Sequence, residues 1–140
     1  MNSETKILML VLFIYLFSGF VSAQPKAVVK PLSYNFGDII QDSVVTTTFI
    51  IKNEGTDLLK IKSLKASCGC TAVVAGKSEL MSGESTDIKV SFDSKGKSGK
   101  QKKIITIETN DPENSTIKLA LTGNVIKKDL KIGKIERLKN

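Results

Sequence analysis

The chain has 140 residues, with 21 Lys and Arg against 14 Asp and Glu, which gives a formal net charge of +7. It has no His and only two Cys, which excludes a Ser–His or Cys–His catalytic pair, an imidazole general base and a four-thiolate zinc site within one chain. This length indicates one domain. We expect no cofactor and no enzyme activity, a thiol redox reaction being the one exception.

The first 23 residues have the organisation of a secretory signal peptide. A run of apolar residues, 7–17, follows a short start that contains Lys6. Val21 and Ala23 fit the small-residue positions of a cleavage site, which predicts cleavage after Ala23. The run is shorter than the ~20 residues of a transmembrane helix. We therefore expect an exported protein, periplasmic or secreted, with no transmembrane span after cleavage.

Two short segments come next along the chain. Residues 27–30 are expected to form a first edge strand, which ends at Pro31 because proline cannot donate to a β-ladder. Residues 35–39 are expected to form a second short piece that crosses to another sheet.

Apolar and polar residues then alternate in several short runs rich in β-branched side chains. This period of two is typical of half-buried strands. Clusters of Asn, Asp, Gly, Ser and Pro separate the runs and indicate turns. The sequence therefore predicts an all-β fold, an immunoglobulin-like antiparallel β-sandwich of about seven strands. The alternating runs are 44–51, 59–63, 87–92, 105–108 and 117–122.

The composition changes after Gly123. Residues 124–140 contain six basic and two acidic residues, and their apolar residues fit neither a helical nor a strand period. We expect the sandwich to occupy residues 24–125 and a partly ordered basic tail to occupy residues 126–140.

Several motifs occur in the order found in a known family. The sequence resembles the bacterial exported family called domain of unknown function 1573 and, at the level of the fold, the immunoglobulin-like sandwiches of the major sperm protein and Hydin group. The resemblance covers residues 34–125 and implies fold and location but no agreed activity. It depends on Asn-Phe-Gly at 35–37, the segments 49–55 and 59–61, Ser-Cys-Gly-Cys-Thr at 67–71, the segments 82–85 and 90–93, and Thr-Asn-Asp-Pro at 109–112.

Cys68 and Cys70 form the one pair with evident chemistry. In an extended strand their side chains would share a face, with Cα atoms roughly 6.5–7 Å apart, at the outer limit for a disulfide. Gly69 permits a turn that shortens this distance. Four interpretations stay open: a structural disulfide, two buried thiols, a redox-active pair, and a soft-metal site for Cu(I) or for zinc shared with a partner chain. Nearby lysines, which favour the redox interpretation by lowering a thiol pKa, are Lys60, Lys62 and Lys65.

A basic hairpin is predicted between two of the strands. It is either a solvated loop or a contact for an anionic surface. Export argues against a nucleic-acid partner, so we expect another envelope protein or an anionic envelope surface. The predicted function is an exported, non-enzymatic binding or structural module of the cell envelope; the alternative is a thiol redox or soft-metal-binding protein acting through the Cys pair. The hairpin lysines are Lys95, Lys97, Lys100, Lys102 and Lys103.

Overall fold

The structure is a computed structural model that describes residues 2–4, 6–9 and 23–128. Most of the predicted signal peptide and residues 129–140 of the predicted tail therefore lie outside the described residues. Within the described part of the chain, no helix has the length and apolar character needed to cross a bilayer.

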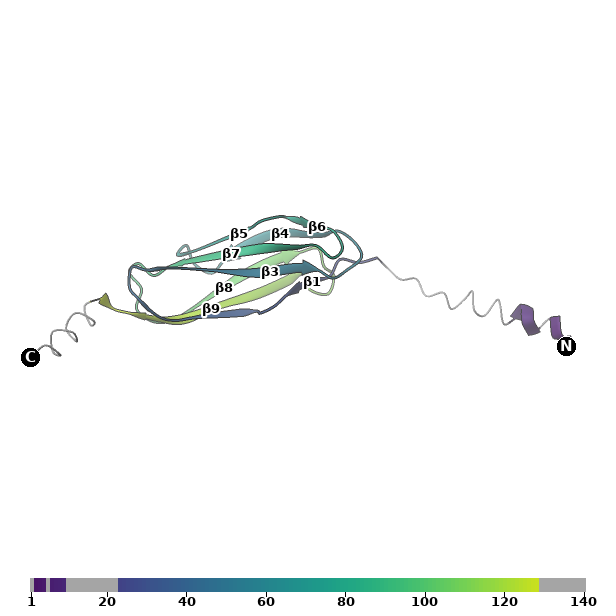
Figure 1. The fold of residues 1–140 in the computed structure, drawn as a ribbon, viewed down its shortest axis with the longest axis horizontal. Coiled ribbons are helices and arrows are strands. Elements are labelled where there is room, and N and C mark those ends of the chain that lie inside the picture. The colour runs from purple at the N-terminus through teal and green to yellow at the C-terminus, as the bar shows by residue number, and fades with distance from the viewer. Residues whose placement is uncertain (1, 5, 10–22, 129–140) are drawn as a thin grey trace, which may run out of the picture.

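Two β-sheets pack face to face into a sandwich (Figure 1). One sheet has the strand order β1-β3-β7-β5 and the other has the order β2-β9-β8-β4-β6. The described strands are β1 (Ala27–Val29), β2 (Ser33–Ile40), β3 (Val44–Asn53), β4 (Leu59–Ala66), β5 (Thr71–Ala75), β6 (Glu79–Leu80), β7 (Ser85–Asp93), β8 (Gly99–Thr109) and β9 (Thr116–Ile126).

The predicted all-β sandwich is confirmed, with two differences in detail. The described residues form nine strands, because β5 and β6 were not visible as alternating runs. The ladder is also not wholly antiparallel, since β2 pairs with β9 in parallel. The first strand was predicted correctly: β1 pairs with β3 at the edge of one sheet, and the chain then crosses through a cis Lys30–Pro31 peptide to β2 in the other.

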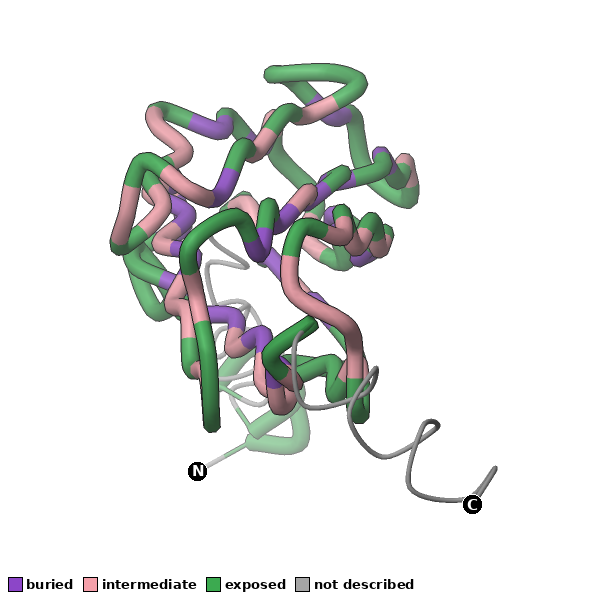
Figure 2. The backbone as a smooth tube through the Cα atoms, turned by 90° about the vertical axis from the view of Figure 1, so that its left-hand side faces the viewer, coloured by how far each residue is buried: buried purple, intermediate pink, exposed green. Residues whose placement is uncertain are grey.

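The core lies between the sheets and follows the period of two. Buried and exposed residues alternate along the strands (Figure 2). Fully burying an aliphatic or aromatic side chain of this size contributes about 1.5–3 kcal/mol, so these positions supply the main stabilisation. The fully buried side chains include Phe49, Ile51, Ile88, Val90, Phe92, Ile105, Ile107, Leu119 and Leu121.

Strand β9 continues past Gly123 to Ile126, and Val125 is buried. Gly123 is required where it stands, because a Cβ there would overlap the ring of Phe36. That ring points inward and stacks on Phe92 of the opposite sheet, with the ring centroids 5.5 Å apart. Phe36 thus ties the bulged edge strand β2 to the core.

Candidate functional site

The Cys pair lies where the chain changes sheets. Ser67 still belongs to the five-stranded sheet, because its N–H donates to the Ile104 oxygen (2.9 Å) and its Oγ accepts from the Ile104 N–H (3.1 Å). Cys70 already belongs to the four-stranded sheet, because its carbonyl accepts from the Asp93 N–H (2.9 Å). Residues 67–70 are therefore the crossover between β4 and β5.

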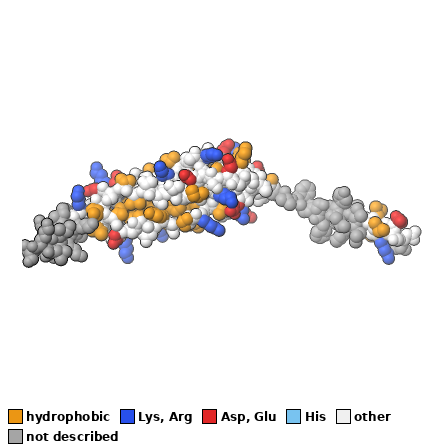
Figure 3. Space-filling model, viewed as in Figure 1, with side chains coloured by type: hydrophobic (Ala, Val, Ile, Leu, Met, Phe, Trp, Pro, Cys, Tyr) orange, Lys and Arg blue, Asp and Glu red, His pale blue; other side chains and the backbone are white. Residues whose placement is uncertain are grey.

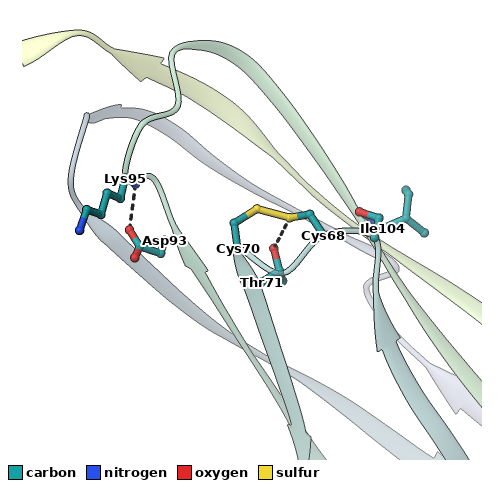
Figure 4. The surroundings of a disulfide bond; sticks show 7 residues. Cys68, Cys70, Thr71, Asp93, Lys95 and Ile104 are labelled. Carbon is teal, nitrogen blue, oxygen red and sulfur yellow. Dashed lines mark hydrogen bonds between the residues drawn. A yellow bond between two sulfur atoms is a disulfide. The ribbon is translucent and has the colours of Figure 1, made fainter.

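Cys68 and Cys70 are joined by a disulfide in this structure (Figure 4). The Cα–Cα distance is 5.3 Å, shorter than an extended strand would give, because the segment turns at Gly69. The Thr71 N–H donates to the Cys68 carbonyl (3.2 Å), and the Thr71 Oγ1 lies 3.6 Å from the Cys68 Sγ. Both Cys residues are half-buried. No group of three or more metal-ligating side chains occurs among the described residues.

A depression of about 280 Å³ opens beside the disulfide. Cys70 and Gly69 line one part of it, and Lys95 and Lys97 line another. The Lys95 N–H donates to Asp93 Oδ1 (2.8 Å), and the Lys95 side chain points away from the sulfur atoms in Figure 4.

Two of the three β4 lysines predicted to affect the thiols have carboxylate partners. Lys60 pairs with Glu79 at 3.2 Å, and Lys65 pairs with Glu108 at 3.7 Å. Because Lys65 and the Ser63 hydroxyl both face Glu108, that carboxylate has a pKa below its ordinary value, the Ser63 hydrogen bond being the larger cause.

The five lysines predicted for the hairpin lie at the same end of the sandwich as the disulfide. The prediction of a hairpin is wrong, however. Strands β7 and β8 belong to different sheets, so residues 94–98 are a crossover. Lys100 and Lys102 lie on the outer face of β8, whereas Lys103 is half-buried at the rim with its Nζ 5.6 Å from the Phe92 ring centroid. The lysines surround one end of the molecule and do not form one patch on one face.

These lysines carry unbalanced charge. The four salt bridges between described residues use Lys52, Lys60, Lys65 and Lys77, and none of these five lysines. Lys127 and Lys128 follow β9 at the same end, which we call the disulfide end and define by residues 41–43, 67–70, 94–103 and 124–128. Figure 3 shows basic side chains at the upper and lower margins of this end. Among the described residues, the acidic side chains close to this end are Asp38, Asp42 and Asp93.

A second depression of about 470 Å³ lies on the outer face of the five-stranded sheet. Lys100 and Lys102 from β8 share it with Asn124 of β9 and Asp38 of β2, and the Asn124 amide donates to Asp38 Oδ1 (3.0 Å). The sequence indicated the lysines but not the other residues, because β2 lies far from β8 and β9 in the sequence and joins them only by pairing with β9.

The fold and the site define an all-β, immunoglobulin-like sandwich with a disulfide at one crossover between its sheets. The chain belongs to the family described as "Protein of unknown function (DUF1573)", whose model matches residues 28–125, as its motifs predicted. A comparison with curated proteins found no match.

Solved structures show the same fold. A protein of unknown function from Porphyromonas gingivalis W83 is 18% identical with a TM-score of 0.66, covering 77% of this chain and 50% of that one. Our chain thus spans half the length of that protein. The seventh PapD-like (ASH) domain of human CEP192 is 13% identical with a TM-score of 0.59, covering 79% of this chain and 92% of that one. The VesB protease of Vibrio cholerae is 16% identical with a TM-score of 0.55, covering 73% and 31%.

Proposed function

We propose that the protein is an exported, non-enzymatic binding module of the cell envelope that docks through its disulfide end onto an anionic envelope surface. Export is supported by the signal-like pattern of the first 23 residues. The single observation that supports docking is the set of lysines without a carboxylate partner around one end of the described sandwich. Uncompensated charge of one sign attracts a surface of the opposite sign.

The placement of the lysines suits an approach along the long axis of the sandwich. Lys95 and Lys97 lie beside the outer face of one sheet, and Lys100 and Lys102 lie on the outer face of the other. A sideways approach would bring one of these pairs to a flat surface, whereas an end-on approach brings both within a Debye length of about 8–10 Å.

Changing Lys95, Lys97, Lys100 and Lys102 to Gln should weaken binding of residues 24–140 to vesicles of phosphatidylcholine and phosphatidylglycerol by roughly 100-fold or more. Each Lys near an anionic membrane contributes about 1 kcal/mol to binding. Vesicle co-sedimentation checks this, and raising the salt concentration should weaken wild-type binding in the same way.

The matched control changes Lys30, Lys62, Lys89 and Lys118 to Gln. This variant loses the same net charge away from the disulfide end. It should keep most of the vesicle binding. Equal losses in both variants would show an effect of net charge alone and would contradict docking through the disulfide end.

A second candidate function is thiol–disulfide exchange, favoured by a half-buried disulfide beside an open depression. Closing so small a loop stabilises the fold by only about 1.5 kcal/mol, so the bond is a weak structural crosslink. A thiolate of a partner dithiol protein would attack one sulfur, and the other would leave as a thiolate. The partner's second thiolate would then attack the mixed disulfide, which leaves the partner oxidised and Cys68 and Cys70 reduced.

Changing Cys68 and Cys70 together to Ser should lower the free energy of unfolding by about 1–2 kcal/mol, whichever function is correct. Thiol counting on the wild type in glutathione buffers separates the two functions. If the protein takes part in thiol–disulfide exchange, the pair should convert between two thiols and a disulfide at redox potentials that glutathione buffers cover. A pair that stays oxidised until the potential falls below about −300 mV is structural.

A further inference from the structure

Most of strand β3 is an unpaired sheet edge on one side. Strand β1 pairs only with Ile51, Lys52 and Asn53, and the chain then leaves for the other sheet at Pro31. From Val44 to Ile50, β3 therefore has β7 on one side and no strand of the described chain on the other.

The ladder shows which backbone groups face the open side. The Asn53 N–H donates to the Glu84 oxygen, and the Ser94 N–H donates to the Ser43 oxygen, so the odd-numbered residues of β3 bond β7. The N–H and C=O groups of the even-numbered residues then point outward. No described strand pairs with Val44, Thr46 or Thr48 on this side, so their outward N–H and C=O groups have no ladder partner, whereas the Ile50 carbonyl lies at the end of the β1 ladder.

Other edges of the described sandwich are protected or short. On β1, the Ala27 N–H is capped by Asp111 Oδ2 (2.7 Å). Strand β2 is bulged between Asn35 and Asp38, β4 is irregular at its lysine-rich edge, and β6 has two residues. Strand β5 is uncharged, but the same ladder argument leaves only the backbone groups of Val73 and Ala75 free for full pairing.

The open stretch of β3 has none of these protections. Residues 44–50 read Val-Val-Thr-Thr-Thr-Phe-Ile, with six β-branched residues, no charge and no proline, in an unbroken register with β7. Native sheets seldom leave such a stretch exposed, because it pairs readily with another extended chain.

A hydrophobic seam runs beside this edge, between β3 and the layer formed by β2 and β9 (Figure 3). The inward residue Val45 is only half-buried at its position on β3. Across the seam, Phe36 and Ile39 of β2 are half-buried and pack against the core. Alternate side chains of an added strand would therefore contact apolar atoms in the seam.

The charges near the open edge of β3 indicate which kind of chain could pair with it. No charged residue lies between Val44 and Ile51, whereas Lys95 and Lys97 share a depression with Val44 at the disulfide end. A second copy fits poorly, because both copies carry +7 and antiparallel pairing centred on Thr47 brings the turn 41–43 of each copy against β1 of the other.

We propose that the open edge of β3 and its seam bind an extended segment of a different protein by strand addition. The segment has alternating uncharged β-branched or aromatic residues, no proline, and acidic residues at the end that lies beside Lys95 and Lys97. This interaction does not depend on the proposed docking to an anionic surface, because it uses a side edge of the sandwich.

The experiment starts from residues 24–140 and a phage-displayed library of random peptides of about ten residues. Selected peptides should alternate as described, and a synthetic copy should shift the amide NMR signals of Thr46, Thr48 and Ile50. Thr48→Pro removes an outward N–H and spares the β7 ladder, so it should weaken the peptide at least about tenfold. Val73→Pro, the matched change on the edge of β5, should leave the affinity unchanged.

Peptides methylated at backbone nitrogen test the same ladder without altering the protein. Methylation at alternate residues that face β3 should abolish binding, and methylation at the intervening residues should be tolerated. Failure to select any peptide, amide shifts confined to β5 or to the lysines, loss of binding in Val73→Pro, or equal tolerance of both methylation patterns would each overturn the proposal.

Discussion

Asn53→Ala is expected to lower the free energy of unfolding by about 3–5 kcal/mol, the largest loss from any single side chain discussed for this protein. Asn53 is fully buried. Its Nδ2 donates to the carbonyls of Asp57 (2.8 Å) and Leu80 (3.0 Å), and its Oδ1 accepts from the N–H groups of Lys26 (3.2 Å) and Gly55 (3.0 Å). Alanine removes the partner of all four backbone groups, of which the Leu80 carbonyl is bonded in a buried position and the other three in partly buried positions. Urea unfolding of residues 24–140 measures the loss.

Two further variants test whether the buried amide of Asn53 causes this loss of stability. Asn53→Asp keeps the shape but places a carboxylate against two carbonyl oxygens, so it should be at least as unstable as Asn53→Ala at neutral pH. Asn124→Ala removes one hydrogen bond at an incompletely buried site and should cost less than about 1 kcal/mol. A loss for Asn53→Ala no larger than that of Asn124→Ala would contradict the role of the buried amide.

The strands could be predicted where burial alternates. Ile88, Val90 and Phe92 face the core while the residues between them face outward, so apolar and polar residues alternate along this strand. Strand β5 carries Ala and Val on both of its faces and therefore shows no alternation of apolar and polar residues. Its strand conformation depends on pairing with β7, and an isolated segment does not show which neighbour it will have.

Which strands pair could be predicted less well than where strands lie. Residues 94–98 have the glycines and lysines of a hairpin turn, but they carry the chain from one sheet to the other. Both Phe92 before this segment and Ile105 after it must be buried, and a hairpin or a crossover satisfies that need equally. Long-range packing selects the crossover, and so it also decides where the lysines lie.

The same limit applies to the motifs. Asn53 and Asp111 lie between the predicted strand runs, where turns are expected, and each does bond nearby residues. Each also reaches a distant segment, Asn53 bonding Lys26 and Leu80 and Asp111 bonding Ala27. These two motifs thus act as structural junctions away from the disulfide end, whereas the Ser-Cys-Gly-Cys-Thr motif at 67–71 lies at that end.

Asp111→Ala should lower the free energy of unfolding by about 2–4 kcal/mol at pH 7. The side chain is buried; its Oδ2 accepts from the Ala27 N–H (2.7 Å), and its Oδ1 accepts from the N–H groups of Glu113 (2.8 Å) and Asn114 (3.1 Å). Without it, the N–H of Ala27 is buried with no acceptor, and β1 loses its link to the turn after β8. Asp93→Ala, which removes an exposed acceptor, is the matched control and should cost about 1 kcal/mol or less.

The loss at Asp111 should depend on pH in one direction. Burial alone would raise the pKa of Asp111, but the N–H donors of Ala27, Glu113 and Asn114 together outweigh it and hold the pKa below its ordinary value. A lowered pKa in the folded state means that the carboxylate stabilises fully above the unfolded value of about 3.9 and loses this effect as pH falls through the folded value. Asp111→Asn does not titrate, and its amide nitrogen would oppose one of the donors. The stability gap between wild type and Asp111→Asn, measured by urea unfolding, should therefore be constant between about pH 7 and pH 5 and shrink as pH falls below about 4. A gap that stays unchanged or widens in acid would show that the carboxylate charge does not hold the N-terminal strand in place.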